Sequence, residues 1–125
     1  MKTNYLIDTN VLIDAQMKRL PADGLAFLSK TIDENFTISF ITYIEFLGYK
    51  DLTVASELFI KLAKVLEVNR AVIDACIKLR KTQRIKLPDS IIAATALINN
   101  YTLISNNERD FVNIEGLNLL NLYSL

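Results

Sequence analysis

The residues best able to do chemistry in this sequence are acids that share one kind of context. Each follows a short apolar or β-rich segment, or opens an apolar one. They are Asp8 after segment 5–7, Glu45 after segment 37–40, Asp89 in segment 87–99 and Asp110 after segment 101–104. Carboxylates brought together repel one another, and a cation relieves that repulsion. If these acids converge, they favour a bound divalent metal ion.

The residue types that are absent from the chain exclude several classes of catalytic and metal site. The chain has no histidine and a single cysteine, Cys76. This excludes Ser-His-Asp and Cys-His catalysis, and also histidine or thiolate zinc sites. A metal here must be a hard cation held by oxygen, such as Mg²⁺ or Mn²⁺. Such a site suits phosphodiester hydrolysis, because the metal activates a water and stabilises charge on the phosphate.

Each acid also has a purely structural interpretation. Asp8 is a candidate helix N-cap, and Asp89 is favourable in a first helical turn because of the helix dipole. Segments 42–45 and 105–108 both match the capping-box pattern. An active site is favoured over four separate caps by the position that the acids share, just past predicted strands.

Strands and helices are predicted to alternate along one domain spanning residues 1–125. The composition is 51% hydrophobic and 22% charged, which is typical of a folded protein. This pattern predicts an α/β fold with a mainly parallel central sheet of four to five short strands flanked by helices. Ligands of such sheets bind beyond the carboxyl ends of the strands. The expected strands are 5–7, 37–40, 65–68, 101–104 and 117–122, and the expected helices are 10–19, 22–33, 42–48, 53–66, 70–84 and 88–99.

Charge is uneven along the chain although the net charge is zero. Five cations and no acid occupy nine residues, at Lys78, Arg80, Lys81, Arg84 and Lys86. This run is either the solvated face of a helix or a set of contacts for RNA phosphates beside an acidic site. Asp14 lies four residues before Lys18, a spacing that predicts an ion pair on a helix surface.

The protein is expected to be cytoplasmic. No signal peptide is evident at the start, and one cysteine allows no internal disulfide. The longest strongly apolar stretch is segment 91–98, whereas a membrane span needs about 20 residues. No membrane association is therefore predicted.

The sequence resembles the PIN-domain family along essentially its whole length. The motifs that carry the resemblance are YLIDTNVLI at 5–13, TYIEFLG at 42–48, LPDSIIAATA at 87–96 and LISNNERDF at 103–111. The resemblance implies a PIN-like fold whose acids bind Mg²⁺ or Mn²⁺ and cut single-stranded RNA. It places Asp8, Glu45 and Asp89 in the family's acidic positions. The fourth position is open between Asn107 and Asp110, and Ser105 stands where threonine is usual.

The resemblance also implies a biological role. PIN domains of this length are often VapC-type toxins, each held inactive by a small antitoxin. We therefore expect a Mg²⁺- or Mn²⁺-dependent endoribonuclease from a type II toxin–antitoxin pair, with Asp8, Glu45, Asp89 and Asp110 as metal ligands. Substrate-binding or supporting roles are expected for Thr9, Asn10, Ser105 and Asn107. A homodimer is expected through apolar helix faces within 42–66.

Two other functions stay open on the sequence. One is an inactive module that keeps the fold and binds RNA or a protein partner. The other is an aspartate-nucleophile phosphatase, which also places Asp after a first apolar strand. That chemistry needs a second carboxylate two residues later, where this chain has Asn10.

Overall fold

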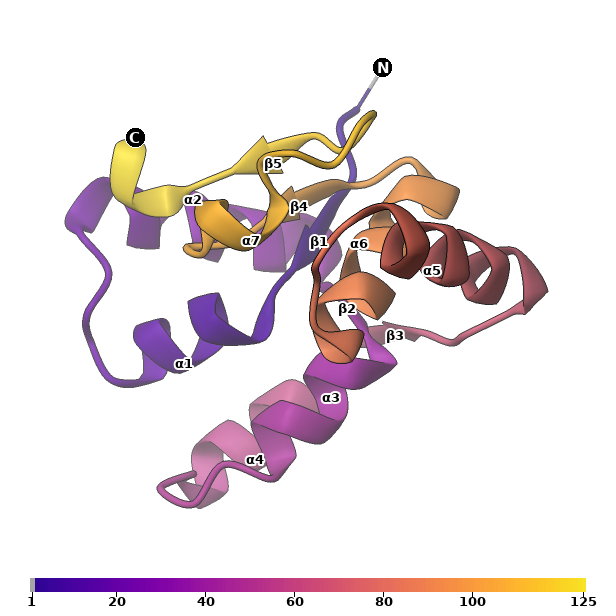
Figure 1. Ribbon diagram of the computed structural model, residues 1–125. Coiled ribbons are helices and arrows are strands. Elements are labelled where there is room, and N and C mark those ends of the chain that lie inside the picture. Colours follow the sequence, from indigo (N-terminus) through magenta and orange to yellow (C-terminus); the bar gives the residue numbers. More distant parts are fainter. Residues whose placement is uncertain (1) are drawn as a thin grey trace.

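Short parallel strands cross the middle of the molecule, and helices cover them on both sides (Figure 1). The computed structural model describes residues 2–125. The strands are β1 Tyr5–Ile7, β2 Thr37–Ser39, β3 Lys64–Leu66, β4 Thr102–Ile104 and β5 Leu119–Leu120. The helices are α1 Thr9–Gln16, α2 Ala22–Asn35, α3 Phe40–Leu47, α4 Val54–Ile60, α5 Arg70–Thr82, α6 Leu87–Asn99, α7 Glu108–Phe111 and the 3₁₀ turn η1 Leu122–Ser124.

Every strand pair is parallel, which confirms the predicted α/β fold. The strands form two ladders, one in the order β1-β4-β5 and a smaller one of β2 and β3. Ile7 at the end of β1 is in register with Ile104 at the end of β4. The residues that follow, Asp8 and Ser105, therefore leave the same edge of the sheet.

The sheet separates two hydrophobic clusters. Leu6 of β1 packs with α5 and α6, whereas the next residue, Ile7, packs with α1, α2 and α3. Successive strand side chains point to opposite faces. Because both faces are covered, the strands are apolar throughout rather than alternating.

Helix α6 supplies the centre of the first cluster. Pro88 lies in its first turn, as predicted, and Asn100 ends it in the left-handed conformation. Its middle is buried at Ile92, Ala93 and Ala94. The small alanine side chains allow α5 and the sheet to pack closely around this helix.

The helix predicted over 53–66 is wrong in its second half. Helix α4 ends at Ile60, and Lys64–Leu66 is a strand that overlaps the predicted strand 65–68. The reason is tertiary: Lys64 N donates to Phe36 O at 2.8 Å, and the segment then pairs with β2. A pairing partner distant in sequence thus overrides the local helical pattern.

Other boundaries shift by a few residues. Phe40 begins α3 instead of ending β2, because Ser39 is the N-cap and its Oγ accepts from Thr42 N at 3.1 Å. Helix α1 stops at Gln16, three residues early, and Lys18 then takes a positive φ of 58°. Helix α7 was not predicted, and β5 is shorter than expected.

The C-terminal turn η1 packs against α2 (Figure 1). The approach is closest at Gly24, where an added Cβ would lie 2.6 Å from Leu122 O. A side chain at this position would push the turn away from the helix. Across residues 2–125, no helix has the length and apolar character needed to cross a bilayer.

Candidate active site

Asp8 lies at the centre of the candidate site, between the end of β1 and the start of α1. It is 4% exposed and is the N-cap of α1, where Oδ1 accepts from Thr9 N at 2.8 Å. Its other oxygen, Oδ2, accepts from Ser105 Oγ at 2.8 Å and from Asn10 Nδ2 at 3.1 Å. The capping interpretation is therefore correct, but the carboxylate also connects β1 to the loop after β4.

The surroundings of Asp8 oppose its ionisation. Burial raises the pKa of its carboxyl from 3.8 to about 6. Hydrogen bonds from Ser105 and Thr9 lower the pKa, whereas the negative charges of Asp89 and Glu45 raise it further. Asp89 and Glu45 are thus near enough to Asp8 for their charges to be felt there.

Glu45 on α3 faces α1 through one direct contact. Its Oε1 accepts from the hydroxyl of Thr9 at 2.7 Å. The predicted capping box at 42–45 is wrong, because Ser39 caps α3 and Glu45 lies in its second turn. Freed from capping, the Glu45 carboxylate lies over the start of α1, beside Asp8.

Asp89 and Asp110 form the opposite side of the cluster. Burial is the largest cause that raises the pKa of Asp89, and the negative charges of Asp110 and Glu45 raise it further. The positive charge of Lys86 lowers it. Asp110 Oδ2 accepts from Asn107 Nδ2 at 2.5 Å. Asn107 therefore contacts the cluster through Asp110, and Asp110 is the acid that lies beside Asp89.

Ser105 and Asn10 organise the floor of the site. Ser105 is fully buried, and its Oγ accepts from Asn107 N at 3.1 Å while donating to Asp8. The predicted capping box at 105–108 is wrong, because Asn107 precedes α7 and makes no side-chain cap. Asn10 Oδ1 accepts from Asn106 N at 3.1 Å, which ties α1 to the same loop.

The sequence did not single out Asn106 or Tyr123, which extend this network. Asp14 Oδ2 accepts from Asn106 Nδ2 at 2.6 Å and from Tyr123 Oη at 3.0 Å. The predicted Asp14–Lys18 pair is wrong, and Arg19 is the ion partner of Asp14 at 3.8 Å. Asn106 could have been proposed as a site residue because it directly follows Ser105, whereas nothing in the sequence pointed to Tyr123.

The four acids lack cationic partners. Within residues 2–125 the Arg19–Asp14 pair is the only salt bridge, so none of the four forms an ion pair with Lys or Arg. Over the same residues, no three Asp, Glu, Cys or His side chains form a group able to hold an ion by themselves. The donors fit Mg²⁺, which binds through one or two carboxylates and keeps several waters.

Comparison with known proteins decides the family. The sequence pattern of the PIN domain matches residues 5–117. The chain belongs to the PIN domain family. No curated protein sequence matches this PIN domain significantly. Its four acids come from β1–α1, α3, α6 and α7, within the matched range.

Solved structures share the fold over nearly their whole length. VapBC-1 from nontypeable Haemophilus influenzae is 28% identical, with a TM-score of 0.76 and coverage of 96% of this chain and 98% of that one. A toxin-antitoxin complex from Klebsiella pneumoniae is 26% identical, with a TM-score of 0.73 and the same coverage. FitAcB from Neisseria gonorrhoeae, at 24% identity, has a TM-score of 0.78 and coverage of 97% and 99%.

Proposed function

We propose that this PIN domain is a Mg²⁺- or Mn²⁺-dependent endoribonuclease that cleaves single-stranded RNA. The observation that carries the proposal is the buried carboxylate of Asp8, which feels the charges of Asp89 and Glu45 and forms no salt bridge with Lys or Arg. Holding so much negative charge in one place costs free energy in the absence of a cation. A divalent ion removes that cost and supplies the chemistry.

Asp8 and Asp89 are the proposed principal ligands, with Glu45 and Asp110 completing the site directly or through water. A bound divalent ion would activate a water for attack and stabilise charge on the phosphate. Asp8 is held for this role by Ser105 and Asn10, and Glu45 by Thr9. Ligands whose hydrogen-bond partners fix their orientation bind metal more tightly.

Asp110 rather than Asn107 is the proposed fourth site residue. The negative charge of Asp110 raises the pKa of Asp89, so the two carboxylates lie close together. The amide of Asn107 is occupied in donating to Asp110. Asn107 therefore orients the acid and does not replace it.

The alternatives receive less support from the geometry. An aspartate-nucleophile phosphatase needs a second carboxylate, two residues after the first, as its acid and base. Asn10, at the position of the required second carboxylate, donates to Asp8 and accepts from Asn106. An inactive module would not need four unpaired acids at one place, since their repulsion destabilises the fold.

We further propose that the protein is the toxin of a cytoplasmic toxin–antitoxin pair. Support comes from two solved relatives above 25% identity, VapBC-1 from Haemophilus influenzae and a toxin-antitoxin complex from Klebsiella pneumoniae. A small antitoxin should then be encoded beside this gene. A homodimer is proposed through α3 and α4, where Ile44 is 60% exposed and Leu58 is 63% exposed.

Incubation of the purified chain with labelled single-stranded RNA tests the main proposal. Cleavage is expected with Mg²⁺ or Mn²⁺ and should stop when EDTA is added. Asp8→Asn should abolish it, whereas Asp51→Asn, a matched change at an exposed acid of the 48–53 loop, should not. Undiminished cleavage by Asp8→Asn would exclude this mechanism. Tight RNA binding without turnover and without metal binding would favour the inactive module.

A further inference from the structure

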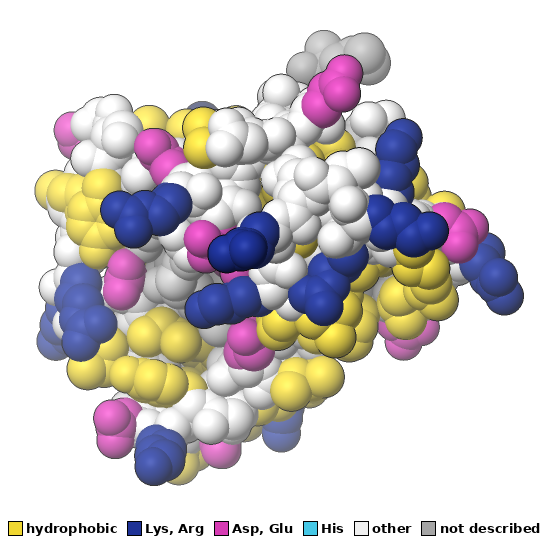
Figure 2. All heavy atoms as spheres, in the orientation of Figure 1, with side chains coloured by type: hydrophobic (Ala, Val, Ile, Leu, Met, Phe, Trp, Pro, Cys, Tyr) yellow, Lys and Arg dark blue, Asp and Glu magenta, His cyan; other side chains and the backbone are white. Residues whose placement is uncertain are grey.

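The basic run of the sequence forms an unpaired surface next to the acids. Lys78, Lys81, Arg84 and Lys86 are exposed along the second half of α5 and the segment after it. None of them takes part in a salt bridge within residues 2–125. Figure 2 shows Lys and Arg side chains spread over the face that α5 and α7 present, with Asp and Glu side chains between them. These cations are free to bind an external anion.

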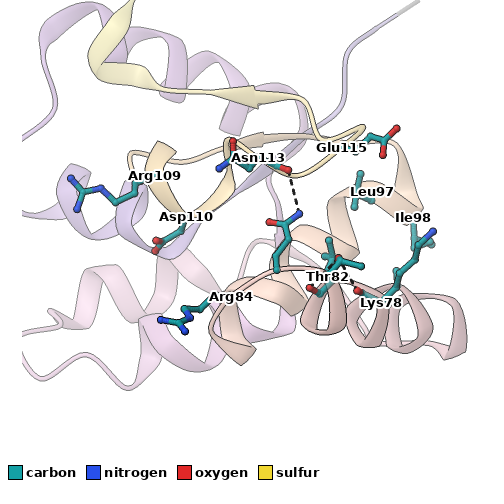
Figure 3. Close-up of a pocket in the computed structure, with 12 residues that line it drawn as sticks. Lys78, Thr82, Arg84, Leu97, Ile98, Arg109, Asp110, Asn113 and Glu115 are labelled. Atoms are coloured by element: carbon teal, nitrogen blue, oxygen red, sulfur yellow. Dashed lines mark hydrogen bonds between the residues drawn. The ribbon is translucent and has the colours of Figure 1, made fainter.

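A groove is lined by two of these cations, Lys78 and Arg84, and by Arg109 of α7. It lies between α5, α6 and α7 and has a volume of about 1070 Å³. In Figure 3, Arg84, Arg109 and Asp110 lie at one end, and Lys78 and Glu115 lie at the other. Because Asp110 lines the groove and also belongs to the acid cluster, the groove borders the candidate active site.

We propose that this groove binds the backbone phosphates of the RNA strand on one side of the cleaved bond. The inference rests on the proposed ribonuclease function and adds a binding subsite to it. A carboxylate cluster repels the polyanion that it must cut, and the net charge of zero provides no compensating attraction. Lys78, Arg84 and Arg109 supply that attraction locally, beside the acids.

The residues that line the groove also indicate that it does not recognise the base sequence of the RNA. None of the residues placed along it is aromatic, so it has no platform on which bases could stack. The amide of Gln83 is already used, because its Nε2 donates to Asn113 O at 3.2 Å. Contacts to phosphates position a strand without reading its sequence. The groove should therefore hold any RNA sequence equally well.

Salt-dependent binding in EDTA tests the groove without any cleavage. The probe is a fluorescein-labelled oligouridine of twelve nucleotides, followed by anisotropy. The groove variant combines Lys78→Gln, Arg84→Gln and Arg109→Gln. Its dissociation constant should rise at least about tenfold, and the slope of log K against log salt should fall by about 2, or roughly 0.7 for each lost phosphate contact.

A matched triple variant controls for the loss of charge. Lys30→Gln, Lys50→Gln and Lys61→Gln remove three exposed cations that lie outside both the groove and the basic run. This control should bind nearly as the wild type does. Equal weakening by both triple variants would overturn the proposal, since the attraction would then be diffuse. Circular dichroism of both variants verifies that each is folded.

Two further measurements distinguish the possible failures. Oligoadenine should bind within about threefold of oligouridine, and a strong preference lost in the groove variant would contradict sequence-independent binding. A polyglutamate peptide that displaces the RNA and binds more tightly would assign the groove to an acidic protein segment. If the wild type cleaves RNA and the groove variant binds and cleaves equally well, only the groove proposal fails. If no divalent ion supports cleavage yet groove-dependent binding persists, only the ribonuclease proposal fails.

Discussion

The hydroxyl of Ser105 donates to Asp8 Oδ2 at 2.8 Å, across 97 residues of sequence. This contact joins the ends of β1 and β4, which lie in register. The position of the central carboxylate therefore depends on correct pairing of two strands from opposite ends of the chain. The fold and the candidate site are linked at this point.

Removing the Ser105 hydroxyl should weaken metal binding more than it weakens the fold. Ser105→Ala leaves Asp8 without its shortest side-chain donor, and the cost in unfolding free energy should be about 1–2 kcal/mol. Manganese affinity, measured by calorimetry, should fall about 10- to 100-fold, because such supporting contacts orient the ligand. Ser105→Thr keeps the hydroxyl and should retain most of the affinity. Unchanged affinity in Ser105→Ala would contradict this supporting role.

Variants at Asp110 and at Asn107 should differ in how their RNA cleavage responds to excess metal. Asp110→Asn removes a charge beside Asp89 and should lower RNA cleavage at every Mn²⁺ concentration. Asn107→Ala removes only the donor that holds Asp110, so its activity should recover as Mn²⁺ is raised. Titration of cleavage rate against Mn²⁺ separates the two cases. The opposite pattern, with recovery only in Asp110→Asn, would make Asn107 the site residue.

The metal-free protein should lose stability as the pH rises toward neutrality. Asp8 has a folded-state pKa of about 6, above its unfolded value of 3.8. The folded state therefore holds a proton that the unfolded state has released between these values, and stability falls as the pH rises through 6. The loss from this group is roughly 2 kcal/mol between pH 4 and 7. Urea unfolding in EDTA at both pH values measures it, with Asp8→Asn as the variant in which this part of the slope should disappear.

The contact between α2 and the C-terminal turn should not tolerate a side chain. Gly24→Ala would place a methyl group 2.6 Å from Leu122 O, and the backbone would have to move. Unfolding free energy should decrease by about 1–3 kcal/mol, as for other overpacked sites. Gly48→Ala meets no contact below 3.1 Å and serves as the control. Equal melting temperatures for the two variants would show that the turn is not tightly docked.

The local spacing of apolar residues was enough to predict most helices and strands. It failed where pairing with a distant segment determines the secondary structure. Pro88 and the apolar run after it predicted α6 correctly, because these signals lie within the helix itself. Segment 64–66 lies where a helix predicted over 53–66 overlaps a strand predicted over 65–68, and its pairing with β2 makes it a strand. The competition between local propensity and tertiary pairing is not visible in the spacing of apolar residues.

In the candidate site, too, local sequence signals predicted some residues, and contacts between distant residues could not be predicted. Asp8, Glu45 and Asp89 could be proposed from the sequence because each follows a strand or begins a helix. The competing interpretation of Glu45 as part of a capping box is wrong, since its carboxylate accepts from Thr9, 36 residues away. The contact of Tyr123 with Asp14 had no signal, because nothing near either residue in sequence indicates the other.

The two hydrophobic clusters on either side of the sheet divide the acids into pairs. Asp8 and Glu45 are carried by α1 and α3, which pack in one cluster, and Asp89 and Asp110 are carried by α6 and α7, which pack in the other. A cation bound by both pairs would cross-link the helices of the two hydrophobic clusters. Loading the site should therefore slow amide hydrogen exchange along β1 and β4, which lie between the two clusters, as well as at the site itself.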